Sequence, residues 1–462
     1  MITQHYPALA YSGYRRYWFG SFASVGGTQL ITLGQAWLVF ELSGSALTLG
    51  YLGLAAALPN LLMTLFGGVV ADRFDKRRVL MATSFSTMTA LILLTLLDYA
   101  GQVQVWHVLL VAAFNSLITG LDWPTRSAIF PLLVERPAYM SAVALNAFIW
   151  QSTRMAIPAL GGVLLAATDT WVVFALGAAG FLGMFLVLAT LKVPHVASAP
   201  SPALQQIAQG LRFIRHTPIF INLLALSFAG SLLSMAYIQI LPVFADVLGR
   251  GEAAYGTLLS AGGVGSVLGT LLTGGVEKRT TLGRLMVGCA TASAVLLIGF
   301  AYAASAGLFY LSLALATCQS LFASAFMVMT MSVLQLKVPD TLRGRVMGIY
   351  SMGFSLVPLG GLLLGSLSEW SNPGTAVIIA NIGYLLILVL LGWLQPRIRE
   401  LNGNELIAVT EESNNGSPAP ERAGSARQAG PEAAQPRNST AQLPDERDPE
   451  ETAREALGPS AR

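Results

Sequence analysis

The stretch Gly68-Val69-Val70-Ala71-Asp72-Arg73-Phe74-Asp75-Lys76-Arg77-Arg78 separates two long apolar runs, Leu47–Ala71 and Val79–Tyr99. Its last seven residues hold two acidic and four basic side chains. Charges at this density cannot lie in the hydrocarbon core of a bilayer, because nothing there replaces their hydration. The stretch therefore predicts a tight turn at a membrane interface, and its bases place that turn on the cytoplasmic side.

The composition is that of a protein with many membrane-spanning segments. The 462 residues are 54% hydrophobic and only 11% charged, with a mean hydropathy of +0.61, whereas soluble domains carry about 25% charge. Since about 20 apolar residues span a bilayer, we predict an all-α membrane protein with twelve transmembrane helices. The predicted spans are Tyr17–Phe40, Leu47–Ala71, Val79–Tyr99, Val105–Leu121, Tyr139–Ala166, Trp171–Leu191, Ile219–Phe244, Tyr255–Val276, Leu282–Tyr302, Gly307–Leu334, Val346–Leu367 and Thr375–Leu394.

The distribution of Lys and Arg predicts the orientation. One set of loops carries nearly all of them, and the opposite set carries only Arg250. Both termini of this multi-pass membrane protein are therefore expected in the cytoplasm. The net charge of +3 is spread over short loops, which argues against nucleic-acid binding. Cys289 and Cys318 lie in apolar runs and indicate neither a disulfide nor a metal site.

The longest internal loop predicts the domain organisation. We expect a six-helix bundle over residues 1–191, a cytoplasmic linker over 192–218, a second six-helix bundle over 219–395 and a disordered cytoplasmic tail over 396–462. Within the linker, apolar residues from Leu204 to Ile214 recur at helical spacing and predict a short amphipathic helix. A plain linker is the alternative. Short similar segments recur about 200 residues apart, which favours two related halves.

The charged turn resembles the loop signature Gly-x-x-x-Asp-Arg-x-x-Lys/Arg-Arg/Lys of the major facilitator superfamily. An ordinary positive-inside loop would explain the bases but not the order of the residues. The resemblance implies a fold of two six-helix bundles and a latch that joins them at the cytoplasmic face. The implied latch residues are Gly68, Asp72, Arg73, Lys76 and Arg77, with Arg126, Arg343 and Arg345 as partners at the inner ends of helices four and eleven.

The segment Pro158-x-x-Gly161-Gly162 resembles the fifth-helix signature Gly-Pro-x-x-Gly-Gly of drug–proton antiporters, with Ile157 in place of the first glycine. Proline permits a kink, and glycine lets a neighbouring helix approach. Plain helix packing explains the pattern equally well. A similar segment recurs at Pro358-Leu359-Gly360-Gly361. The candidate kink residues are Pro158, Gly161, Gly162, Pro358, Gly360 and Gly361.

Three other stretches are similar to the enterobactin-exporter and macrolide-efflux branch of that superfamily, the transmembrane secretion effectors. They are Leu38–Ser45, Pro124-Thr125-Arg126 with Ala144-Leu145-Asn146, and Gly344–Tyr350. The resemblance extends over Arg15–Pro396. It implies a multidrug or siderophore efflux protein of the cell membrane, an antiporter driven by the proton gradient. A solute-uptake permease of the same fold is the alternative function.

Arg154 lies about 20 Å into the fifth span. An arginine at that depth must face protein or water. It either attracts an anionic or carbonyl-rich cargo in a central cavity or bonds neighbouring helices. The other candidates for cavity contact are amides and a hydroxyl at similar depth. The full candidate set for the substrate cavity is Gln29, Gln35, Asn115, Arg154, Ser234, Gln239 and Gln319.

The coupling ion is not determined by the sequence. The first span has glutamines where many drug–proton antiporters carry an acid, and the fourth has no acid before its predicted end at Leu121. Glu41, Asp98 and Asp122 are candidates for proton binding, and sodium coupling or simple facilitation stays open. We expect a monomer in the lipid bilayer with a small-molecule substrate, no cofactor and no metal. The chain lacks the phosphate-loop, His-Glu-x-x-His and Gly-x-Ser-x-Gly motifs of enzymes.

Overall fold

The computed structural model describes residues 6–73, 75–191, 193, 212, 214–215, 218–273, 281–338, 340–393, 395–399 and 401. For 64–73, 123–124, 218, 340–341, 343–344 and 397 it describes the backbone alone. These ranges are helical and contain no β-strand. Most of the predicted amphipathic helix in the linker, and the tail beyond residue 401, lie outside them.

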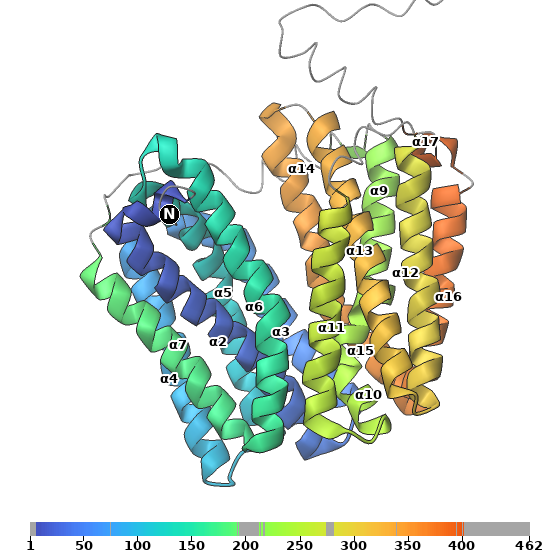
Figure 1. Cartoon of the computed structure of the whole chain (residues 1–462), viewed down its shortest axis with the longest axis horizontal. Helices are drawn as coiled ribbons and strands as arrows, with labels where there is room; N and C mark the ends of the chain where they lie inside the picture. Colours follow the sequence, from blue (N-terminus) through green and yellow to red (C-terminus); the bar gives the residue numbers. More distant parts are fainter. Residues whose placement is uncertain are drawn as a thin grey trace, which may run out of the picture. The chain divides into compact units, whose positions relative to one another are not determined.

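The first half of the chain forms long helices that pack on one another. They are α2 (Ser12–Ser43), α3 (Ala46–Arg73), α4 (Lys76–Tyr99), α5 (Val105–Ile129), α6 (Tyr139–Ala167) and α7 (Thr170–Thr190). The short turns η1 (Pro7–Ala10), η2 (Phe130–Leu133) and η3 (Arg136–Ala138) adjoin them. Helix α2 packs on α6 and α7, and α5 packs on α3 and α4 (Figure 1).

The second half repeats this pattern with more interruptions. Its first long segment consists of α9 (Pro218–Ala229), the π-turn η4 (Gly230–Ser234), the 3₁₀ turn η5 (Met235–Ile240) and α10 (Leu241–Val247). Then follow α11 (Gly251–Leu272), α12 (Leu282–Ser305), α13 (Phe309–Lys337), α14 (Asp340–Met352), η7 (Gly353–Ser355), α15 (Leu356–Trp370), α16 (Pro373–Ile387), η8 (Leu388–Trp393) and α17 (Pro396–Arg399). Helix α13 packs on α11 and α12, and α16 packs on α12 and α15.

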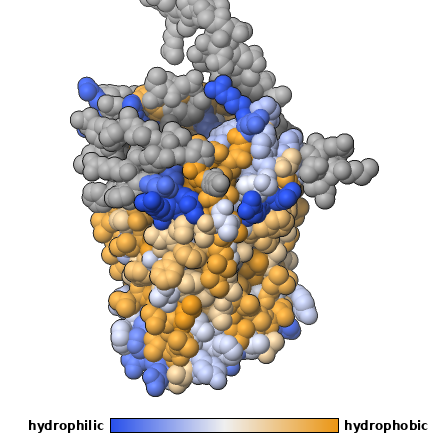
Figure 2. All heavy atoms as spheres, turned by 90° about the vertical axis from the view of Figure 1, so that its left-hand side faces the viewer, coloured by the Kyte–Doolittle hydropathy of each residue, from blue (hydrophilic) through white to orange (hydrophobic). Residues whose placement is uncertain are grey.

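Ten helical segments in the described ranges are long and apolar enough to cross a membrane. Helices α2 and α6 are also long enough but are not among these ten segments. Twelve crossings therefore remain a prediction. Figure 2 shows an apolar band across one face of the molecule, with hydrophilic residues at its borders, as expected for a lipid-facing surface.

The two ends of the helices differ in charge. Glu41, Asp98, Asp169 and Glu369 lie at one end, which we call the acidic end. Arg15, Arg77, Arg136 and Lys337 lie at the other, which we call the basic end. The two names follow from the alternating direction of successive helices and assign no side of the membrane.

Glycines bring helices of the two halves together near the acidic end. Helix α6 packs on α11, and α3 packs on α15. A Cβ atom built on Gly256 would lie 2.4 Å from the Cα atom of Gly162, and one on Gly50 would lie 2.7 Å from the Cα atom of Leu362. These distances are too short for any side chain, so glycine is required where the backbones meet.

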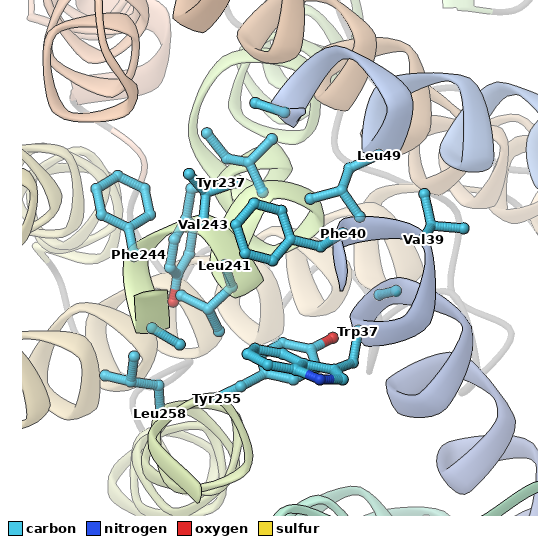
Figure 3. Close-up of a cluster of buried hydrophobic side chains, with 14 of the residues drawn as sticks. Trp37, Val39, Phe40, Leu49, Tyr237, Leu241, Val243, Phe244, Tyr255 and Leu258 are labelled. Carbon is cyan, nitrogen blue, oxygen red and sulfur yellow. The ribbon is translucent and has the colours of Figure 1, made fainter. Parts of the chain in front are cut away.

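An apolar cluster reinforces this contact between the halves. Trp37 of α2 stacks on Tyr255 of α11, with their ring centroids 6.1 Å apart, and Leu241 and Phe244 of α10 are buried in the same cluster (Figure 3). The burial of these large side chains excludes water from the acidic end of the boundary between the halves.

Two ordered elements extend beyond the boundaries predicted for them. The fourth span was expected to end at Leu121, but α5 continues to Ile129. Its charges are tolerated inside the helix because Asp122 and Arg126 form an ion pair one turn apart. The tail was expected from residue 396, but α17 packs on α12, and the Gly283 amide donates to the Leu401 carbonyl at 3.2 Å. Ile398 and Leu401 are buried there.

Candidate transport site

A cavity of about 160 Å³ lies inside the first half of the chain. Its walls come from α2 to α7, and most of its polar lining belongs to α2 and α5. The lining residues are Val25, Thr28, Ile31, Thr32, Gln35, Ala56, Thr87, Ala112, Asn115, Ser116, Ile118, Thr119, Asp122, Arg126, Trp150 and Phe181. Pockets for drug-sized molecules measure about 300–1,000 Å³, so this cavity has room for one moiety of such a molecule.

One face of α5 forms the polar wall of this cavity. Asn115, Thr119, Asp122 and Arg126 follow one another at intervals of three or four residues, which places them on the same side of a helix. The neighbouring helix α2 contributes Gln35, one of the predicted substrate contacts. The side chains that line the cavity thus include amides, hydroxyls and one pair of opposite charges.

The pair of charges is almost fully enclosed. The Arg126 guanidinium donates through Nε to the Asp122 carboxylate, and the two side chains are 10% and 17% exposed. The Thr83 hydroxyl donates to Asp122 Oδ1 at 2.9 Å, and Arg126 Nη1 donates to the Ser24 hydroxyl at 3.1 Å. Each charged group therefore has an oppositely charged partner and a hydrogen bond with one hydroxyl, which is what a buried ion pair needs.

Two amides in the cavity lack partners. Gln35 Nε2 and both polar side-chain atoms of Asn115 are buried and have no hydrogen-bond partner among the described residues. Buried amides are normally hydrogen-bonded. Because both amides line the cavity, a molecule that enters it can supply both donors and acceptors to them.

A second, smaller cavity of about 10 Å³ adjoins the first. It is lined by Ser21, Ser127 and Asn146 and shares Val25, Arg126 and Trp150 with the larger cavity. Its volume corresponds to about one water molecule. Arg126 thus lies between the two cavities. The smaller cavity lies towards the basic end of α2, and the larger one lies deeper in the first half.

The other predicted cavity residues lie elsewhere. Gln319 of α13 accepts from the Tyr237 hydroxyl at 3.4 Å and donates to the Ser293 hydroxyl at 3.1 Å, so it bonds neighbouring helices. Gln239 packs over Gly361 and beside Gly53. Ser234 is buried at the end of the π-turn η4, and Gln29 is half-buried on α2. None of the four lines either described cavity.

Arg154 differs from Arg126 in its surroundings. Its side chain is exposed, and its guanidinium has no hydrogen bond or ion pair with any residue that the structure describes. Its backbone carbonyl packs on Gly263 of α11, 3.1 Å from where a Cβ atom there would lie. Arg154 therefore lies beside a contact between the halves and outside the described cavities, where it interacts electrostatically with Tyr237 of the second half.

The predicted latch residues are only partly described. Arg77 donates through Nε and Nη2 to the carbonyls of Leu188 and Ala189, each at 2.6 Å, and so caps the end of α7 within its own half. Arg126 is buried beside the cavity and does not lie in a loop. Lys76 and Arg345 lie at the basic end. Only the backbone of Gly68, Asp72, Arg73 and Arg343 is described.

The predicted kink residues take part in close helix contacts. Helix α6 continues through Pro158, and Gly161 faces Leu30 and Leu33 of α2. In the second half the helix breaks at η7, shortly before Pro358. A Cβ atom on Gly360 would lie 2.0 Å from the Leu232 carbonyl oxygen, and Gly361 faces Gln239. Whether either segment bends during transport stays a prediction.

Comparison with known families identifies the chain. The family model described as "Transmembrane secretion effector" matches residues 3–421. The chain belongs to this family. It is thus a membrane transporter of the major facilitator superfamily, as the resemblance of its charged turn implied, and its small-molecule substrate follows from the family.

Relatives of this chain include transporters of siderophores and drugs. It is 25% identical to the staphyloferrin A transporter of Staphylococcus aureus, over 76% of this chain and 88% of that protein. It is 27% identical to the enterobactin exporter EntS of Escherichia coli, over 70% of this chain and 78% of that protein. It is 26% identical to the multidrug efflux pump Tap of Mycolicibacterium fortuitum, over 83% of this chain and 96% of that protein.

Solved structures agree on the fold. A bacterial homologue of the iron transporter ferroportin, in an inward-facing state, superposes with a TM-score of 0.64 at 16% identity and covers 82% of this chain and 98% of its own. A variant of the nucleoside transporter NupG superposes with a TM-score of 0.66 at 15% identity, and the match covers 82% of this chain and 99% of that one. The major facilitator fold expected from the sequence is confirmed.

Proposed function

We propose that this protein exports small amphipathic molecules, drugs or siderophores, across the bacterial inner membrane by alternating access. The observation that carries this proposal is the family match over residues 3–421, together with relatives named for enterobactin export and multidrug efflux. The cavity supports it physically, because its amides and ion pair offer polar contacts inside an otherwise apolar bundle.

The proposal assigns a side of the membrane to each end of the helices. The basic end faces the cytoplasm, together with both termini, because Lys and Arg concentrate in cytoplasmic loops. The two bundles are residues 1–191 and 219–395, and the packing at the acidic end closes the site to the outside. The protein works as a monomer, exchanges cargo for protons and leaves the cargo chemically unchanged.

Transport in two membrane orientations tests this function. The chain is expressed in a bacterial host stripped of its own pumps, and uptake of drugs and siderophores is measured in inverted vesicles and in intact cells. Export predicts accumulation inside inverted vesicles that a proton uncoupler abolishes. Accumulation inside intact cells would instead identify an uptake permease of the same fold.

The charged turn supplies a prediction about the latch. We expect Asp72→Asn to reduce transport roughly tenfold or more, because a latch of about 1–3 kcal/mol between the halves is lost. The protein should still insert in normal amounts. Drug resistance per unit of membrane-inserted protein is the measurement.

Asp75→Asn is the matched control for this turn. The Asp75 carboxylate accepts hydrogen bonds from the amides of Arg77 and Arg78 at the start of α4, and asparagine caps helices almost as well. Normal transport is expected. Equal losses in both variants would show that the turn tolerates no change of charge and would remove the special role of Asp72.

The Arg154 guanidinium predicts a charge preference. We expect Arg154→Ala to reduce export of anionic cargo roughly tenfold while export of cationic cargo changes little, because an exposed cation attracts anions at modest cost. Arg154→Lys should retain most of the activity. Vesicle transport of one anionic and one cationic drug measures the ratio, and equal losses for both would indicate a packing role.

A further inference from the structure

Helices α2 and α5 bring two side-chain amides to the same depth of the larger cavity. The two helices run in opposite directions and are in contact. The hydrogen bond of 3.1 Å from Arg126 of α5 to the Ser24 hydroxyl of α2 fixes their register. Gln35 follows Ser24 by eleven residues, and Asn115 precedes Arg126 by eleven. At 1.5 Å per residue, both amides therefore lie about 16 Å from this bond, in the direction of the acidic end.

The same spacing keeps both amides on the cavity side of their helices. Eleven residues make close to three full turns of an α-helix, so Gln35 lies on the face of Ser24 and Asn115 lies on the face of Arg126. Because Ser24 and Arg126 face each other, the two amides do so as well, and both line the larger cavity. A group that enters the cavity can therefore contact both.

The two amides offer a cargo free hydrogen-bonding atoms. Gln35 Nε2, Asn115 Nδ2 and Asn115 Oδ1 are buried and form no hydrogen bond within the described ranges. A buried polar atom without a partner costs free energy, which a ligand with matching groups recovers. Four hydroxyls of the lining already donate to backbone carbonyls and offer a cargo only lone pairs. They belong to Thr28, Thr32, Ser116 and Thr119.

The charges of the cavity disfavour an ionised group beside these amides. Among the lining residues Asp122 is the acid and Arg126 is the base, and the two form an ion pair. An ionised group of the cargo would therefore be buried there without a counter-ion, which is costly for either sign of charge. An uncharged polar group can enter, whereas a charged part of the same cargo stays outside this cavity.

We propose that the larger cavity recognises an uncharged amide group of the cargo, and that Gln35 and Asn115 are the residues that determine this specificity. The inference rests on the proposed function and names a chemical class within it. The class comprises primary carboxamides and lactams, which present a C=O acceptor and an N–H donor on one edge. Esters lack the donor, and carboxylates carry a charge.

The free atoms match such a group one by one. The cargo N–H donates to Asn115 Oδ1, and Asn115 Nδ2 donates to the cargo carbonyl, so that the two amides pair edge to edge. A carbonyl oxygen has two lone pairs, and the second accepts from Gln35 Nε2. All three atoms that lack a partner among the described residues are then satisfied.

Binding of benzamide to the purified full-length protein in nanodiscs tests the inference. Methyl benzoate has the same ring and a carbonyl but no N–H group, and benzoate is ionised at neutral pH. Benzamide should bind roughly tenfold more tightly than either, because it alone can pair with both polar atoms of Asn115. Ligand-observed NMR measures the dissociation constants. Equal binding of benzamide and methyl benzoate overturns the inference, as does a protein that binds none of the three at millimolar concentration.

Two variants locate the preference. Asn115→Leu should abolish it, and Gln35→Met should reduce it severalfold. Neither should lower the temperature of thermal unfolding, because the atoms removed have no partner in the part of the chain that the structure describes. If one variant fails to fold, the other decides.

Gln29→Met is the matched control for these variants. Gln29 lies on α2 as Gln35 does, but it lines neither described cavity. This variant should keep the full preference for benzamide. A preference that survives in both cavity variants, or that is lost equally in the control, overturns the assignment of Gln35 and Asn115.

The binding assay separates this inference from the proposed function. A protein that exports drugs from cells but does not distinguish benzamide from methyl benzoate refutes the amide site and leaves export intact. A protein that prefers benzamide through Asn115 but moves no drug or siderophore in either vesicle orientation refutes export and keeps the amide site.

Discussion

Replacing Arg126 with alanine is expected to abolish transport and to destabilise the protein by about 3–5 kcal/mol. The reason is that the Asp122 carboxyl group would be left inside the first half with no cation beside it, and breaking a buried ion pair by removing one partner is far more costly than keeping the pair. The Ser24 hydroxyl would lose its donor as well.

Arg154→Ala is the matched control for stability. It removes the same side chain from another membrane helix, but this guanidinium forms no ion pair with a carboxylate among the described residues. We expect a change within about 0.5 kcal/mol. Thermal unfolding in detergent, followed for both variants and the wild type, measures the difference. Equal stability of the two variants would contradict the importance of the pair.

Gly256→Val is expected to reduce transport by roughly 5- to 150-fold through loss of the state closed at the acidic end. The new Cβ atom would lie 2.4 Å from the Cα atom of Gly162 and 2.6 Å from the Pro158 carbonyl oxygen. Both are backbone atoms, so neither can rotate away, and α6 and α11 must separate. Such overpacking costs about 1–3 kcal/mol, which sets the size of the shift in population.

Thiol labelling measures this shift directly. In a protein with Cys289 and Cys318 changed to serine, Ala46→Cys reports the acidic end, because Ala46 is buried there against Gly365. Gly256→Val should make this cysteine react faster with an impermeant reagent added outside cells. Gly288→Val is the control, since nothing lies within 4 Å of its Cβ position. Slow labelling in both would count against the proposed closure.

Much of the fold could be predicted because lipid imposes simple rules. The long apolar runs, the charged turn at residues 72–78 and the excess of Lys and Arg on one side all follow from the cost of charge in hydrocarbon. The end of α5 could not be predicted in this way. Asp122, Pro124 and Arg126 together look like the start of a loop, and only the pairing of Asp122 with Arg126 keeps them within the helix.

The site was predicted less well than the fold. Gln35 and Asn115 were expected in a cavity, and both line one. Gln319 was expected there too, but it bonds Tyr237 and Ser293, which a sequence alone does not place beside it. Asp122 was a candidate for proton binding but not for the cavity. The spacing of Asn115, Thr119, Asp122 and Arg126 on one face of α5 was the signal that could have placed it there.

The larger cavity draws all its walls from α2 to α7, and this has a consequence for how the transporter can evolve. Substitutions that broaden or narrow the choice of drug should accumulate between residues 25 and 181. Substitutions in the second half should instead alter how fast each cycle runs, for every compound alike. Mutations selected by successive antibiotics would then fall mostly in one half of the gene.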